Sequence, residues 1–363
     1  MINFQFSKKI DWVLLITVLL LVTVGLLSIF SIGQKGDSKI FQRQLIYTVL
    51  GIFLMFVFVL FDYRVFRDNS FVLLGLYFFC FLLLAGVLLV GREIRGVSSW
   101  FRIGQIGFEP VELMKLVIIL VLAKYFSLRH IEVYRLRHLI ISGLYIIFPL
   151  VLILLQPELG YALIIILVWG GMIIIAGIKL KHLVILTLIG LIIFSVSWFF
   201  LLQDYQKERI TSFLNPGSDP LGQGYHIIQS TIAIGSGKFF GRGLGHGTQS
   251  QLHFLPEQHT DFIFATIAEE LGFLGSFFIL VLFGILLYRL IKISLAISNN
   301  FARLFSAGLA TMVLFQAVIN IGMNMGLLPI MGIPLPFVSY GGSSMVVSFI
   351  ALGIIQSIVV RNK

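Results

Sequence analysis

Long apolar runs, separated by short polar segments, dominate the chain. Ten of them have about the length that a membrane-spanning helix needs, roughly 20 residues for a hydrocarbon core of about 30 Å. They lie at residues 12–33, 45–62, 71–90, 109–127, 139–155, 158–177, 183–202, 262–288, 303–326 and 342–360. No run alternates between apolar and polar positions as barrel strands do. The pattern predicts an all-α polytopic membrane protein with ten transmembrane helices, organised as one domain over residues 1–363.

Composition and charge narrow the class further. Hydrophobic side chains make up 58% of the 363 residues and charged side chains 12%, whereas soluble domains carry roughly 25% charged residues. The single cysteine, Cys80, excludes a disulfide scaffold. No segment concentrates enough of the +10 net charge to follow a nucleic acid backbone. With the N-terminus inside, the inner segments carry more Lys and Arg than the outer ones, which predicts that both termini are cytoplasmic.

One polar segment is much longer than the others. Residues 203–261 form a predicted outer loop that is rich in glycine and histidine, and a long loop on a compact bundle is usually functional. Its glycine-rich run, 235–245, does not have the spacing of nucleotide-binding loops. Lys238 and Arg242, with glycine backbone N–H groups, could still bind a phosphate. Glycines that only let the loop turn tightly explain the run equally well.

Several carboxylates and one lysine lie inside the apolar runs. Glu112 and Lys115 are three residues apart on one helical face, and a charge at membrane depth costs at least about 2.5–3.5 kcal/mol. They form either a structural ion pair or the wall of a polar cavity in which the lysine meets an anion. Glu269 and Glu270 point about 100° apart. We therefore expect one of these two to line a cavity and the other to cap or pair with a neighbouring helix.

Asp261 stands where the outer loop meets the eighth apolar run. Aspartate is a favoured helix N-cap at such a place, but a partly desolvated carboxylate at the membrane surface also suits a general base. Both explanations stay open at this point. His253 and His259 could tune that base or bind a metal. The polar stretch Ser339–Ser344 follows three prolines and is predicted to be a re-entrant loop packed inside the protein.

Three blocks of sequence resemble the SEDS family of bacterial membrane proteins, the RodA and FtsW type. The strongest block is residues 255–272, and the others are 235–245 and 334–342. The family's fold is a bundle of ten transmembrane helices with a large extracytoplasmic loop between helices 7 and 8. The resemblance implies a peptidoglycan glycosyltransferase of the bacterial inner membrane, surrounded by membrane lipid, that polymerises lipid II into a nascent glycan strand. It also implies a class B penicillin-binding protein, a transpeptidase, as partner.

The resemblance assigns roles to single residues. It makes Asp261 the essential catalytic residue and places Glu112, Lys115 and Trp100 in the substrate site. The further candidates for substrate binding are Arg102, Lys238, Arg242 and Ser339. We expect the acceptor hydroxyl to attack with inversion and undecaprenyl diphosphate to leave. A divalent cation, Mg²⁺ or Mn²⁺, is a candidate cofactor for this step.

The chain departs from the family pattern at three places. Glu109 stands where glutamine is usual, and Val111 follows where serine is usual. Ser99 replaces the arginine that normally precedes the tryptophan. Glu158 and Tyr161 stand where aspartate and threonine are common. Which arginine meets the diphosphate, and what the 156–161 turn contacts, are left open by these changes.

Two other functions compete with the enzyme. A flippase for lipid-linked precursors would also use ten helices and intramembrane charges, but it needs alternating access, usually with repeat symmetry between the halves. No internal repeat is evident here. A non-catalytic scaffold for a penicillin-binding protein would not require Asp261, Glu112 and Lys115 together. Within the family, short termini favour a role in cell elongation, of the RodA type.

Overall fold

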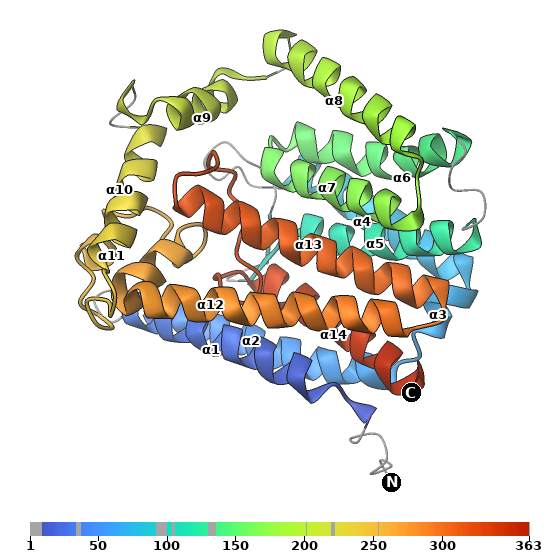
Figure 1. Ribbon diagram of the computed structural model, residues 1–363, viewed down its shortest axis with the longest axis horizontal. Coiled ribbons are helices and arrows are strands. Elements are labelled where there is room, and N and C mark those ends of the chain that lie inside the picture. The colour runs from blue at the N-terminus through green and yellow to red at the C-terminus, as the bar shows by residue number, and fades with distance from the viewer. Residues whose placement is uncertain are drawn as a thin grey trace.

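Helices make up most of the structure (Figure 1), a computed structural model that describes residues 9–33, 38–91, 100–103, 106–129, 136–200, 202–218, 222–252 and 254–362. Nine helices of this described part are long and apolar enough to cross a membrane. They are α1 (Trp12–Gly33), α2 (Ser38–Leu60), α4 (Ser70–Val90), α6 (Leu136–Leu155), α7 (Leu159–Ala176), α8 (Leu180–Phe200), α12 (Ile263–Ala296), α13 (Asn300–Asn324) and α14 (Gly342–Asn362). The predicted class, an all-α multi-pass membrane protein, is confirmed.

The remaining predicted span forms helix α5, Pro110–Leu128. Its charged residues are Glu112, Lys115 and Lys124, and most of its side chains are buried against α4, α7 and α13. Ionisable residues at membrane depth are tolerated when they face the inside of a bundle, so this central position accounts for the charges on α5. The structure is consistent with ten spans.

The two chain ends lie at one end of the bundle, and the long predicted loop lies at the other (Figure 1). That loop is largely ordered into α9 (Asp204–Leu214), a 3-10 turn (Pro216–Ser218), α10 (Gln223–Ser236) and α11 (Thr248–Gln251). Two further short elements precede α5. Helix α3 (Arg64–Asp68) follows α2, and strands β1 (Phe101–Ile103) and β2 (Ile106–Phe108) form an antiparallel hairpin. The apolar pattern predicted none of these, because each is short and only partly apolar.

Helix α8 stands apart from the other helices in Figure 1. Of the 21 residues of this helix, only His182 is buried. Its exposed side chains are mostly leucine, isoleucine and phenylalanine. Apolar residues exposed over a whole helix are suited to contact with lipid rather than with water.

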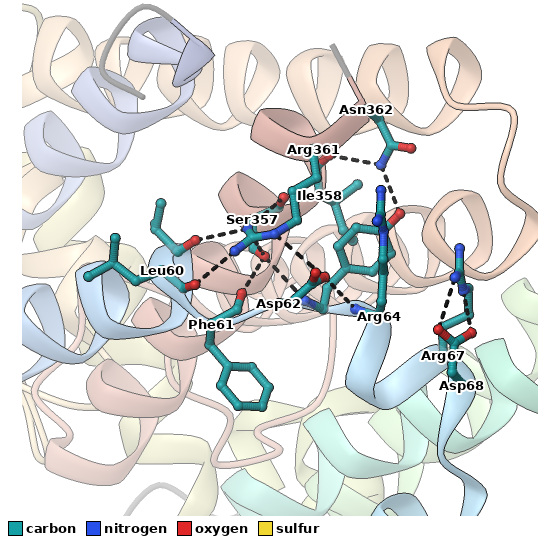
Figure 2. Close-up of polar contacts among 12 residues, drawn as sticks. Leu60, Phe61, Asp62, Arg64, Arg67, Asp68, Ser357, Ile358, Arg361 and Asn362 are labelled. Atoms are coloured by element: carbon teal, nitrogen blue, oxygen red, sulfur yellow. Dashed lines mark hydrogen bonds and ion pairs between the residues drawn. The ribbon is translucent and has the colours of Figure 1, made fainter. Parts of the chain in front are cut away.

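Polar side chains tie the C-terminus of the chain to the bundle (Figure 2). Arg361 of α14 donates to the carbonyl oxygen of Leu60 at 2.7 Å and pairs with Asp62 at 3.5 Å. A cation at this place complements the negative C-terminal end of α2. Close by, Arg67 donates two hydrogen bonds to Asp68, at 2.6 and 2.9 Å, and these bonds lower the pKa of the Asp68 carboxyl below its usual value.

The non-helical segment between α13 and α14 packs inside the bundle. Of the stretch Ser339–Ser344, which the sequence predicts to be a packed loop, the part up to Gly341 belongs to this segment, whereas α14 already begins at Gly342. A Cβ on Gly25 in α1 would lie 2.3 Å from the carbonyl oxygen of Val338, and a Cβ on Gly160 in α7 would lie 2.2 Å from that of Met331. Both distances are shorter than any normal Cβ contact. Glycine at these two positions therefore lets the segment approach the backbone of both helices.

Gly25→Ala should destabilise the protein, because the added methyl group has no room against the Val338 backbone. Overpacking of this kind typically costs about 1–3 kcal/mol. Gly75→Ala in α4 is the matched control, since nothing lies within 4 Å of its Cβ position and alanine is the better helix former. Thermal unfolding in detergent measures both variants. Equal melting temperatures would contradict the close contact.

Candidate active site

A cavity of about 700 Å³ is enclosed by segments that are far apart in the sequence. It is lined by parts of α2, the β-hairpin with the residue before it, the residue before α5, the first turn of α7, α9, the residues before α12, the segment before α14 and the first turn of α14. Its ionisable and aromatic lining residues include Arg43, Tyr47, Trp100, Glu109, Glu158, Tyr161, Arg209, Glu257, His259, Asp261 and Tyr340. Carboxylates, guanidinium groups and aromatic rings thus share one space inside a membrane protein.

Backbone hydrogen bonds hold Asp261 at the wall of this cavity. Asn320 and Asn324 of α13 donate from their side-chain amides to the Asp261 carbonyl oxygen, at 3.0 and 2.9 Å. Helix α12 begins at Ile263, and its N-cap residue is Phe262. Because Asp261 is not the N-cap, the helix-capping explanation does not account for this aspartate. The structure instead places it on the cavity, where a carboxylate can meet a substrate.

Ser339 supports the Asp261 segment from behind. Its hydroxyl donates to the Thr260 carbonyl oxygen at 2.6 Å and accepts from the Leu335 N–H at 2.8 Å. The side chain of Gln44 in α2 donates to the Ser339 carbonyl oxygen at 3.2 Å. Ser339 is buried and is not among the residues that line the cavity. Its contacts are therefore those of a residue that positions the Asp261 segment.

Trp100 also lines the cavity and directly precedes the β-hairpin. Its indole ring is 3.0 Å from the position that a Cβ on Gly107 would take. A side chain at position 107 would therefore crowd the ring. Arg102 pairs with Gly107 in the hairpin register. The side chain of Arg102 and all of His253 lie outside the described residues.

Glu112 and Lys115 form an ion pair behind the cavity wall. Lys115 Nζ is 2.9 Å from Glu112 Oε2, and the two side chains are 2% and 3% exposed. Neither residue is among those that line the cavity, whereas Glu109 and Tyr161 are. The Tyr161 hydroxyl is hydrogen-bonded to Glu109, and its ring centroid is 4.8 Å from Lys115 Nζ. The structure thus shows the ion pair and places it next to the cavity instead of in its lining, and the contact of the lysine with an anion stays a prediction.

The glycine-rich run braces α12 and does not line the cavity. The Arg242 N–H donates to the Glu269 carbonyl oxygen at 3.0 Å, just before Gly272 breaks α12 with a φ of 68°. The Arg242 guanidinium donates to the Thr248 hydroxyl at 2.9 Å. Lys238 and Arg242 are absent from the cavity lining. The structure favours the explanation that these glycines let the loop turn tightly.

Glu269 and Glu270 both bind this braced loop. Glu269 accepts from the backbone N–H groups of Gln249 at 2.8 Å and Ser250 at 3.0 Å, in helix α11. Glu270 accepts from the Ser31 hydroxyl of α1 at 2.6 Å. The prediction that one glutamate pairs with a neighbouring helix is confirmed for Glu270. The prediction that the other lines a cavity is wrong for the 700 Å³ cavity, because Glu269 instead satisfies the backbone of α11.

Sequence reasoning missed two arginines of the cavity lining, Arg43 in α2 and Arg209 in α9. The Nε atom of Arg209 is buried and has no hydrogen-bond partner among the described residues. Helix α9 reaches the cavity because the Tyr205 hydroxyl donates to the Pro157 carbonyl oxygen at 3.4 Å. The sequence does not indicate that Arg209 lines a cavity, because its position there depends on how α9 packs against the bundle.

The fold and the cavity together define a polytopic helical membrane protein with a polar internal site. The family model of the FtsW/RodA/SpoVE cell cycle proteins matches residues 9–363. The chain belongs to this family.

Its relatives are similar along their whole length. Stage V sporulation protein E of Bacillus subtilis is 40% identical over 358 residues, which is 96% of each chain. Peptidoglycan glycosyltransferase MrdB of Escherichia coli is 36% identical over 361 residues, covering 99% of this chain and 96% of MrdB.

Two solved structures have a similar fold. One belongs to a study of how a peptidoglycan synthase complex coordinates polymerization and crosslinking, with a TM-score of 0.83, 36% identity and coverage of 96% and 97% of the two chains. The other is the crystal structure of the Rod shape determining protein RodA of Thermus thermophilus, with a TM-score of 0.73, 31% identity and 97% of both chains covered.

Glu269→Gln should lower the stability of the folded protein. Gln249 and Ser250 donate to different oxygens of Glu269, so the amide would turn a donor toward one of these two N–H groups and leave the other a neutral acceptor. Hydrogen bonds to a charged group are worth about 1.5–3 kcal/mol. Glu208→Gln is the matched control, because Glu208 is exposed on α9 and such surface changes stay within about 0.5 kcal/mol. The melting temperature in detergent is the measurement. An unchanged value for Glu269→Gln would show that the α11 contact contributes little.

Proposed function

We propose that this chain is a peptidoglycan glycosyltransferase that polymerises lipid II into glycan strands and releases undecaprenyl diphosphate. Relatives over the whole chain carry the name peptidoglycan glycosyltransferase. The observation that carries the proposal is the cavity itself, in which the Asp261 carboxylate shares one space with the guanidinium groups of Arg43 and Arg209. A base beside cations is what the transfer of a sugar from a diphosphate donor requires.

In the proposed reaction, Asp261 takes the proton from a sugar hydroxyl of the acceptor. The hydroxyl oxygen then attacks the anomeric carbon of the donor, and the configuration at that carbon is inverted. The bond between this carbon and the diphosphate oxygen breaks, so undecaprenyl diphosphate leaves with the electron pair. Arg43 and Arg209 stabilise the negative charge that the leaving group gains. Hydrogen bonds from α13 to the Asp261 backbone keep the base in place.

The other site candidates divide into two groups. Trp100 lines the cavity and is suited to contact the substrate, and Arg102 stays a candidate contact from the same hairpin. Lys115, paired with Glu112, acts on the cavity from behind its wall. The remaining candidates hold neighbouring segments in place instead of touching the substrate; these are Lys238, Arg242 and Ser339.

A divalent cation is part of the proposal. Glu109, Glu158, Glu257 and Asp261 line the cavity, and carboxylates are the ligands that Mg²⁺ prefers. Within the described ranges, however, no group of three His, Cys, Asp or Glu side chains is arranged to hold a metal ion. A cation here would therefore need oxygen ligands from the substrate diphosphate, whose charge it would neutralise.

The cellular setting follows from the proposed reaction. Lipid II presents its sugars on the outer face of the bacterial inner membrane, so the cavity end of the bundle would face outward and both termini would be cytoplasmic. A class B penicillin-binding protein would cross-link the strands, and the structural relative from a peptidoglycan synthase complex supports such a partner. Since the relatives include MrdB, RodA, FtsW and a sporulation protein, the role in elongation stays a prediction.

Asp261→Asn should abolish glycan polymerisation while the protein still folds and inserts. Loss of a positioned general base typically costs about 10²–10⁴-fold in rate. The measurement is the polymerisation of purified lipid II, followed on a glycan gel for the wild type and the variant. Asp204→Asn is the matched control, because Asp204 is exposed on α9 and does not line the cavity.

Each result of this assay decides between the functions considered. If the wild type and Asp204→Asn make product and Asp261→Asn does not, the result would support both the glycosyltransferase function and the role of Asp261 as its base. Polymerisation by Asp261→Asn at the wild-type rate would remove Asp261 from the role of base. No product from the wild type, even with the partner present, would favour a flippase or a scaffold.

Removal of divalent metal should slow the reaction. A chelator would leave only Arg43 and Arg209 to compensate the negative charge of the cavity carboxylates and the substrate diphosphate, so activity should fall and return when Mg²⁺ or Mn²⁺ is added back. The assay is the same polymerisation of lipid II, run with chelator and then with excess metal. Full activity in the presence of chelator would exclude a required cation.

A further inference from the structure

The side chain of Tyr161 separates Lys115 from the cavity. Lys115 is 2% exposed and does not line the cavity. Tyr161 lines it, and the centroid of its ring lies 4.8 Å from Lys115 Nζ. A molecule in the cavity therefore meets Tyr161 before it meets the ammonium group.

Lys115 has few other contacts that could hold its ammonium group. Nζ is 2.9 Å from Glu112 Oε2, but it has no well-aligned hydrogen bond within the described part of the chain. An ammonium group can form three hydrogen bonds. Glu112 and Glu109 are the charged neighbours of Lys115, and the face of the Tyr161 ring is a further attractive partner. Such cation–π contacts are strongest where water is excluded.

Tyr161 is itself held firmly. Its hydroxyl is hydrogen-bonded to Glu109, and the Glu109 N–H donates to the Ser343 hydroxyl at 2.9 Å. The preceding residue, Gly160, packs against the Met331 carbonyl oxygen with no room for a side chain. The first turn of α7, α5 and the start of α14 therefore fix the ring in one place.

We propose that Tyr161 is a positioning residue for the transfer reaction, which it serves by holding the Lys115 ammonium group against the cavity wall. This inference rests on the proposed glycosyltransferase function. Because Lys115 does not line the cavity, it makes no direct hydrogen bond to bound lipid II, and its effect should grow as the leaving diphosphate gains charge. It acts on the negative charge that develops as the diphosphate leaves. Loss of the Tyr161 ring should therefore lower kcat and leave KM nearly unchanged.

The test replaces Tyr161 with phenylalanine and then with phenylalanines that carry one, two and three ring fluorines. Fluorine withdraws charge from the ring face and weakens a cation–π contact, while the volume of the ring changes little. Tyr161→Phe should lose less than about tenfold in kcat, the effect of one hydrogen bond. Relative to this variant, kcat should fall stepwise with each fluorine. Tyr161→Leu, which has no ring, should lose roughly thirtyfold.

The same fluorinated series at Phe126 is the matched control. Phe126 is buried on α5, one of the two helices joined by the Tyr161–Lys115 contact, and it lies outside the cavity lining. Its fluorination should leave kcat unchanged within about twofold. Melting temperatures of all variants in detergent show whether they fold, and only variants that melt as the wild type does are compared.

The possible results separate this inference from the function on which it rests. A stepwise fall in kcat at position 161, with KM within about threefold and no fall at position 126, would support it. Equal rates along the series, in an active wild type, would overturn the role of the ring and leave the glycosyltransferase function intact. A rise in KM with constant kcat would make Tyr161 a binding contact and overturn positioning. No product from the wild type would overturn both.

Discussion

The need to compensate buried charge governs the centre of this protein. Helix α5 carries Glu112 and Lys115 where both are almost completely buried, and an unpaired charge at such a site is costly. Pairing the two neutralises the net charge, and the Tyr161 ring adds a second partner for the ammonium group. Helices α4, α7 and α13 enclose this pair. The polar cavity lies next to this pair, where Glu109 precedes α5 and where α7 begins.

Asp261 depends on a different set of supports. It lies on a short non-helical segment, and such a segment holds its shape inside a protein only when its backbone polar groups find partners. Asn320 and Asn324 supply them from α13, and Ser339 supplies one from the segment before α14. These hydrogen bonds hold the segment at a place where Asp261 lines the cavity.

The spans could be predicted from sequence because their signal is local. Helix α1 has the same limits as the apolar run 12–33. Helix α2 begins at Ser38, before the predicted run 45–62, because its first turns are polar and a search for apolar runs does not include them. The hairpin before α5 and helices α9 to α11 gave no such signal. The roles of Arg209 and Glu269 could not be predicted either, because each depends on which distant segment packs against it.

The same residue types therefore take different roles in this fold according to what lies next to them. Glu269 satisfies backbone N–H groups, Glu112 compensates a lysine, and Asp261 faces a cavity with its backbone already satisfied. Of these three carboxylates only Asp261 lines the cavity, which a proton acceptor for a bound molecule has to do. The amide groups of Asn320 and Asn324 fix the Asp261 backbone at this place, and a fixed position within reach of the substrate is the first requirement for a general base.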